Sequence, residues 1–77
     1  MKTHADWQAQ AKQLIRAELK RRDLTYRELA DRMNAMGLKV NERTIANKIA
    51  RGGFTAAFFL QCMDALGVKY LPLDTGN

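Results

Sequence analysis

The chain has little of the chemistry that enzymes and exported proteins commonly use. Its 77 residues include one cysteine, one proline and one histidine. A single cysteine cannot form an internal disulfide, so folding in an oxidising compartment would gain nothing. The lone His4 has no second ligand at metal-binding spacing, and Gly52-Gly53 matches neither the dinucleotide-binding nor the Walker pattern. We find no nucleophile–base pair or paired-carboxylate site, and we therefore expect no enzyme activity, metal, cofactor or small-molecule substrate.

Long apolar runs are also lacking. No stretch approaches the roughly 18 apolar residues of a membrane helix, and the opening MKTHADWQ lacks the apolar segment of a signal peptide. We therefore expect a cytoplasmic, nucleoid-associated protein without membrane contact. No repeat or linker divides the chain, which predicts one domain over residues 1–77, with a core over about 6–67 and a tail over 68–77.

Positive charge is concentrated in the middle of the chain. The formal net charge is +5, and residues 12–51 hold 11 of the 13 Lys and Arg but only 5 of the 8 Asp and Glu. A basic segment between nearly neutral ends fits a polyanionic partner on one face, although it would serve equally well as a solvated surface.

Helix signals divide the chain into four helices. The first helix is predicted to begin between Thr3 and Asp6 and to run to about Arg22. Thr25 and Glu28 form the T-x-x-E pattern of a capping box, which predicts the start of the second helix.

The remaining helices show similar boundaries. Asn41 is the predicted N-cap of the third helix, and the glycines after Arg51 end it. The fourth helix is predicted to begin at Thr55 and to end at Gly67. Residues 68–77 read as a short extended tail.

The third helix has two different faces. Four polar residues share one stripe because they fall at i, i+3, i+4 and i+7: Thr44, Asn47, Lys48 and Arg51. Ile45 and Ile49 lie on the other side. We predict that the isoleucines are buried and that the four polar residues are exposed, presenting groups that read base edges and hold phosphates.

The chain resembles a known DNA-binding family over about residues 12–69. The segments LKRRDLTYRELADRM, NERTIANKIARG and FFLQCMDALGV are similar to helices of the Cro and phage-repressor type of helix-turn-helix domain. The pattern also resembles a short bacterial domain family of unassigned function. The resemblance implies an all-α, compact four-helix, lambda-repressor-like domain whose third helix enters the major groove.

Two features depart from the repressor pattern. Tyr26 occupies the place after the second-helix cap where the family usually has Gln, whose amide contacts phosphate or base. The segment from Leu29 to Ile45 is about five residues longer than the common family spacing, with the extra residues around 34–39. We infer a longer second helix and a longer turn.

Carried over by position, the resemblance implies a set of DNA contacts. The first turn of the third helix would reach base edges, Asn47 would bond adenine, and the basic residues would meet phosphates. The candidate residues are Tyr26, Arg27, Lys39, Asn41, Arg43, Thr44, Asn47, Lys48 and Arg51.

Each assignment has a structural alternative. Asn41 can serve only as an N-cap, and Tyr26 is as well explained by packing as by phosphate binding. Thr44, Asn47 and Lys48 can belong to an ordinary solvated face. Cys62 reads as a buried thiol rather than a redox sensor.

The sequence favours a sequence-specific transcriptional regulator that binds double-stranded DNA. A homodimer is expected because the core is small and because Trp7, the fourth helix and the tail carry more apolar surface than one domain needs. The alternatives are a protein–protein interaction module and a nonspecific nucleoid-type DNA-binding protein.

Overall fold

The protein is all-helical throughout the part of the chain that the computed structural model describes, residues 1–71 and 73. The four helices are α1 (His4–Arg21), α2 (Tyr26–Ala35), α3 (Glu42–Arg51) and α4 (Ala56–Leu66). The predicted four-helix, all-α fold is therefore confirmed. Among these described helices, none has the length and apolar content that crossing a lipid bilayer would require.

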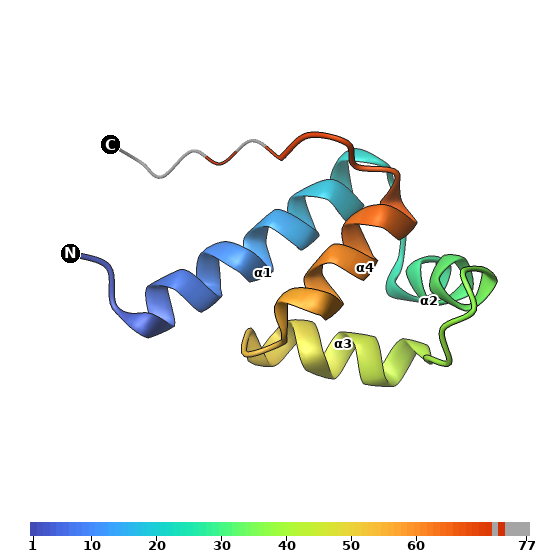
Figure 1. Ribbon diagram of the computed structural model, residues 1–77, viewed down its shortest axis with the longest axis horizontal. Coiled ribbons are helices and arrows are strands. Elements are labelled where there is room, and N and C mark those ends of the chain that lie inside the picture. The colour runs from blue at the N-terminus through green and yellow to red at the C-terminus, as the bar shows by residue number, and fades with distance from the viewer. Residues whose placement is uncertain (72, 74–77) are drawn as a thin grey trace.

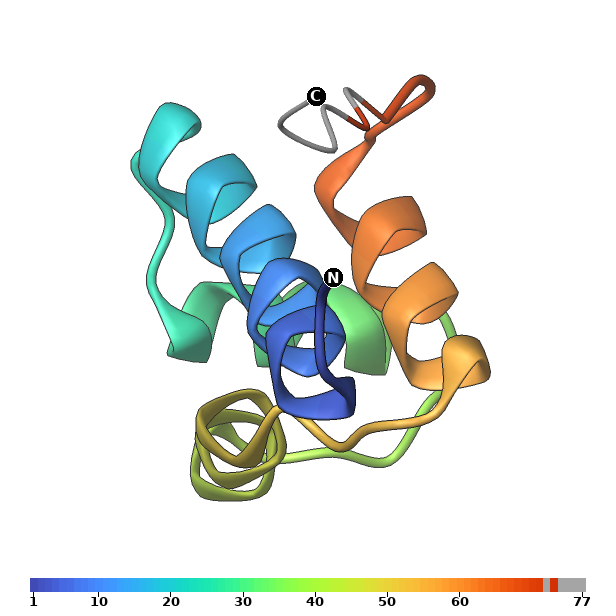
Figure 2. The ribbon, with the colours of Figure 1, turned by 90° about the vertical axis from the view of Figure 1, so that its left-hand side faces the viewer.

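The helices pack around one small core, with α3 on its outer edge. In Figure 1, α1 is the longest helix, α4 lies across it, and α2 closes the end of the molecule beyond α4. Seen after the 90° turn of Figure 2, α3 still lies below the other helices, and the segment that follows α4 lies above them. The outer side of α3 and the segment after α4 therefore occupy opposite sides of the molecule.

Side-chain caps begin all four helices. Thr3 and Asp6 form a capping box at α1, and Thr25 and Glu28 form the predicted one at α2. Thr55 Oγ1 accepts a hydrogen bond from the Phe58 amide at 3.1 Å at the start of α4. Each cap pairs amide groups that would otherwise have no partner within the helix, and so the helix starts are set by local sequence.

Glycines in the left-handed region end or follow three of the helices. Gly52 (φ 72°) and Gly67 (φ 75°) cap α3 and α4. After α2, Met36 is the C-cap, and Gly37 (φ 94°) is the next residue. A residue with a Cβ would be strained in this conformation, and so these glycines stop the helices sharply.

The core is a single cluster of apolar side chains drawn from all four helices. Buried isoleucine, leucine, methionine and phenylalanine side chains dominate it. Its members are Ile15, Leu19, Leu29, Ala30, Met33, Ile45, Ile49, Phe58, Cys62, Met63 and Leu66. Through Ile45 and Ile49, α3 completes this cluster, and it packs mainly against α2 and α1.

The segment after α4 turns back over the body of the molecule. Val68 and Leu71 pack against the core cluster, whereas Tyr70 is 90% exposed. The described residues of this segment contain no helix, as predicted for the tail. The rest of the predicted tail, residues 72 and 74–77, lies outside the described residues.

Candidate nucleic-acid interface

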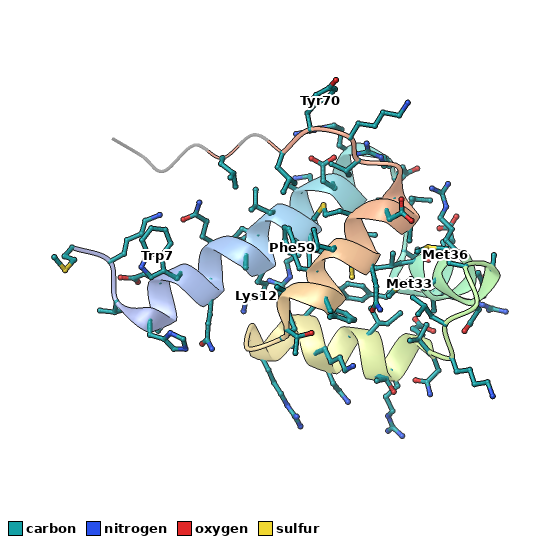
Figure 3. The ribbon with its side chains drawn as sticks, viewed as in Figure 1. Trp7, Lys12, Met33, Met36, Phe59 and Tyr70 are labelled. Carbon is teal, nitrogen blue, oxygen red and sulfur yellow. The ribbon has the colours of Figure 1, made fainter. Side chains whose placement is uncertain are left out.

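Helix α3 has one fully buried side and one polar, exposed side. Ile45 and Ile49 are 0% exposed. Four polar residues on the other side are exposed, as the spacing predicts: Thr44, Asn47, Lys48 and Arg51. Figure 3 shows nitrogen-tipped side chains projecting from this side of α3 away from the other helices. The helix therefore presents hydroxyl, amide, ammonium and guanidinium groups on one outward face, which we call the α3 polar face.

The start of α3 is held by Asn41. Its Oδ1 accepts a hydrogen bond from the Thr44 amide at 2.8 Å, which confirms that Asn41 is the N-cap. The side-chain oxygen is thus already used in the fold. Contact with a base would draw on the remaining amide group, and so capping and base contact are compatible roles for this one residue.

The end of α3 is held against α1. Lys12 Nζ donates a hydrogen bond to the Ala50 carbonyl at 3.2 Å, where the last carbonyls of the helix lack partners within it. Gly52 is buried, and a Cβ placed on it would lie 3.4 Å from the Gln8 carbonyl oxygen. The positive φ of 72° explains why a glycine stands at this position, since an added Cβ would only reach ordinary van der Waals contact with α1.

The turn before α3 is closed by one side chain. Asn34 Nδ2 donates to the Val40 carbonyl, and the Val40 amide donates to Asn34 Oδ1, both at 2.9 Å. The two bonds tie the last turn of α2 to the residue before the Asn41 cap. The turn of residues 36–41 is thus an ordered connection that sets the direction from which α3 begins.

The basic residues at the end of α3 lie beside α4. Lys48 Nζ is 5.1 Å from the centre of the Phe58 ring. Lys48 and Arg51 also line a shallow pocket of about 280 Å³ with Phe54, Thr55 and Phe58. The two cations therefore meet where the end of α3 adjoins the start of α4.

The other predicted contact residues are distributed around α3. Arg43 is exposed in the first turn of α3, Lys39 is exposed in the preceding turn, and Arg27 is exposed at the start of α2. Tyr26 is different, because it is half-buried and packs against the core cluster. Packing therefore accounts for the Tyr26 ring without any ligand.

One buried acidic residue was not anticipated as part of an ion cluster. Glu18 is only 2% exposed, and its carboxylate accepts hydrogen bonds from Arg21 Nη1, at 2.9 Å to Oε2, and from Arg22 Nη1. The only sign of this burial in the sequence is that Glu18 falls at the same helical spacing as the apolar residues of α1. The two arginines balance a buried charge, which makes them less available as phosphate ligands.

The structure also defines the surroundings of Cys62, Trp7 and the Phe54–Phe59 pair. Cys62 is 0% exposed, and burial raises the pKa of its thiol to about 12 against the opposing effect of Lys48. The prediction of a buried thiol is confirmed. Trp7 is 52% exposed, so it is not a core anchor. Phe54 and Phe59 have stacked rings whose centres are 6.3 Å apart across the start of α4.

Comparison with known proteins identifies a family without an assigned activity. No curated protein and no solved structure matches the chain. One family model, described as "Domain of unknown function (DUF6471)", matches residues 7–71. The match covers most of the chain and includes the α3 polar face, the Asn34–Val40 connection and the buried Glu18. The chain therefore belongs to this DUF6471 family.

Proposed function

We propose that this protein is a sequence-specific DNA-binding protein, a transcriptional regulator that places α3 in the major groove of double-stranded DNA. The main observation in favour of this proposal is that α3 has one buried apolar side and one exposed polar side. Two fully buried isoleucines attach the helix to the core, and a continuous polar stripe faces away from it. This stripe combines a hydroxyl, an amide and two cations, a set of groups that suits contact with both bases and phosphates.

The chemistry of the α3 polar face supports base readout. An asparagine amide can bond adenine through two hydrogen bonds, and a threonine offers both a hydroxyl and a methyl group to base edges. Arg43 and Thr44 lie in the first turn of α3, and Asn47 follows Thr44 by about one turn on the same face. Residues near the start of a recognition helix are those that reach bases.

The surrounding cations support phosphate contact. Lys48 and Arg51 lie at the end of α3, and Arg27 and Lys39 lie on the elements before it. Cations at the end of α3 and on the elements before it suit contacts with the DNA backbone beside a major groove. Each phosphate neutralised should add about 0.9 to the slope of log K against log salt.

The resemblance to the Cro and phage-repressor type favours a homodimer. Such dimers set two recognition helices about 34 Å apart, so that they enter successive major grooves and read a palindrome. The outward position of α3 suits this arrangement, because a second copy can pack elsewhere without covering the α3 polar face.

The proposal is tested by selecting bound sequences from random duplex DNA and measuring affinity for the selected site against salt. The decisive variant combines Asn47→Ala, Lys48→Ala and Arg51→Ala. Two lost phosphate contacts should lower the salt slope by about two, and the lost asparagine contact should weaken discrimination by about 1–3 kcal/mol. A matched control removes two cations elsewhere, by Lys2→Ala with Lys69→Ala, and should leave the site preference unchanged.

Three outcomes contradict the proposal in different ways. Affinity that does not depend on salt, or no binding to any duplex, excludes DNA as the partner. Equal affinity for the selected site and random duplex indicates a nonspecific nucleoid-type protein. A folded triple variant with unchanged affinity and salt slope removes α3 from the interface and favours a protein-interaction module.

A further inference from the structure

Helix α1 carries a row of positive charges beside its buried stripe. Ile15 and Leu19 face the core. Lys12, Arg16 and Lys20 fall at i, i+4 and i+8, so they share one side of the helix. Arg16 and Lys20 are exposed, and Lys12 is half-buried. We call these three residues the α1 basic ridge, and none of them belongs to the α3 polar face or to the DNA contacts that the sequence predicts.

The α1 basic ridge lies alongside α3. At one end, Lys12 Nζ bonds the Ala50 carbonyl in the last turn of α3 (Figure 3). At the other end, Arg16 and Lys20 line an open hollow of about 460 Å³ together with Glu42, the first residue of α3. The ridge is about 12 Å long by the rise of an α-helix. It therefore runs antiparallel to α3 and spans most of its length.

The fold makes little use of the exposed charges of the ridge. Among the described residues, the ion pairs join Glu18 to the two arginines at the end of α1, and neither Arg16 nor Lys20 forms one. Glu42 is the one acidic side chain that lines the hollow, so two cations against one carboxylate leave it with a net positive charge. Lys20 lies in the last turn of α1, where a cation favours the helix dipole, but Arg16 lies a turn earlier. The Arg16 guanidinium in particular is free to meet an external anion.

The position of the ridge beside α3 decides what it would meet on DNA. The major groove is about 12 Å wide, and an α-helix with its side chains is about 10–12 Å across. A helix in the groove therefore fills it, and the sugar–phosphate backbones at the groove edges meet the protein surface beside the helix. On the α1 side of α3, that surface is the α1 basic ridge, where Arg16 and Lys20 are exposed.

We propose that the α1 basic ridge is a phosphate-binding surface, which contacts one backbone of the duplex whose major groove holds α3. Arg16 and Lys20 bind the phosphates. Lys12 holds the end of α3 against α1 and so fixes the ridge beside the α3 polar face. The inference rests on the proposed function, because it names backbone contacts within the same DNA complex. Such contacts contribute affinity and orientation but no base preference.

The test uses the full chain and the DNA site that it selects. Arg16→Ala with Lys20→Ala should lower the slope of log K against log salt by about 1.8, because two phosphate contacts are lost. Between about 50 and 200 mM salt, the wild-type affinity should fall by a factor about 12 times larger than that of the variant. The preferred DNA sequence should not change. Lys12 is left intact because its bond to Ala50 holds α3.

Two matched variants control for charge and fold. Arg16→Lys with Lys20→Arg keeps both charges and should keep the wild-type slope. Lys2→Ala with Lys69→Ala removes the same charge away from the ridge and should leave the slope unchanged. Circular dichroism and urea unfolding check that each variant is folded.

Neutral methylphosphonates, placed one at a time along the selected duplex, locate the contact. At the phosphates that the ridge binds, the replacement should weaken binding of the wild-type chain. It should have no further effect on the Arg16→Ala, Lys20→Ala variant, because the contact is already lost and the two changes are not additive.

Three results overturn the inference but spare the proposed function. One is a wild-type salt slope in the double alanine variant, in a protein whose slope the α3 triple variant still lowers. Another is a methylphosphonate effect that is the same in wild type and variant at every phosphate. The third is a changed sequence preference in the variant, which would assign the ridge to bases. A wild-type chain that binds no duplex overturns both proposals.

Discussion

The α3 polar face differs in almost every chemical respect from a second surface, an open groove between α1 and α4 that we call the α1–α4 groove. Its apolar lining is Trp7, Leu14, Phe54, Phe59, Leu71 and Leu73. The first is a stripe of polar and cationic groups on one helix, and the second is an apolar hollow shared by two helices and the tail. The polar face can be recognised from residue spacing because one helix carries it. The groove depends on segments that are distant in sequence, so only packing creates it. The contrast teaches that a surface carried by one element can be predicted locally, and that one formed between elements cannot.

The largest effect is expected from a substitution in the core, because unfolding destroys both surfaces together. Ile45→Ala leaves a cavity under α3 and should cost about 2–5 kcal/mol. A core this small supplies only about 3–5 kcal/mol, so the substitution removes most of the unfolding free energy and a substantial fraction of the protein should be unfolded at room temperature. Urea unfolding followed by circular dichroism checks this. A well-folded variant with full DNA affinity would mean that α3 does not depend on its buried side.

A smaller effect is expected at the junction of α3 with α1. Gly52 has a φ of 72°, and a Cβ there would meet the Gln8 backbone at 3.4 Å. Gly52→Ala should cost about 1–2 kcal/mol because a side chain is strained in the left-handed region. Gly67→Ala is the control, since it has a φ of 75° but no atom within 4 Å of the added Cβ. The two variants should lose similar unfolding free energies, because 3.4 Å is an ordinary van der Waals distance, and a markedly larger loss in Gly52→Ala would show that contact with α1 adds strain.

The next effect separates capping from DNA contact at the polar face. Asn41→Ala removes the cap and should cost about 1 kcal/mol, whereas Asn41→Ser keeps a capping oxygen and should restore most of that stability. If Asn41 also contacts a base, the serine variant is stable but has weaker preference for the selected site. A serine variant with wild-type site preference would assign Asn41 to capping alone.

The smallest effect at neutral pH concerns the thiol in the shared core. Burial raises the pKa of Cys62 from 9.0 to about 12. Below pH 9 the thiol is neutral in both the folded and unfolded states, so it does not influence stability. Between pH 9 and 12 the unfolded state loses the proton more readily, and stability should fall as the pH rises. Urea unfolding across this range, compared with Cys62→Ala, isolates the effect.

Thiol reactivity gives an independent check of the same burial. At pH 8 the folded protein should react slowly with a disulfide reagent, and addition of urea should accelerate the reaction by exposing Cys62. Equal rates with and without urea would contradict a buried position for this side chain.

Several features of the fold followed from short stretches of sequence. The Thr25–Glu28 capping box, the Asn41 and Thr55 caps and the glycine after Arg51 all act within one helical turn. Each cap or stop depends only on neighbouring backbone groups, so the local sequence pattern was sufficient to predict the helix boundary. The burial of Ile45 and Ile49 followed in the same way from helical spacing.

Other features depend on contacts between residues that are not neighbours in the sequence. Lys12 bonds a carbonyl 38 residues away, and the Asn34 amide closes the turn through Val40. The exposure of Trp7 depends on where α4 begins relative to α1. None of these features can be predicted from residue spacing, because each depends on which helices and turns pack against one another.

The sequence by itself determined the four helices, their caps and the two faces of α3, because these depend on interactions within a few residues. Only the tertiary structure decided that Glu18 is buried with Arg21 and Arg22, that the polar face lies on the outer edge, and that an apolar groove opens between α1 and α4. The physical reason is that burial and charge pairing are properties of the packed arrangement. They arise only when segments far apart in the chain exclude water from one another.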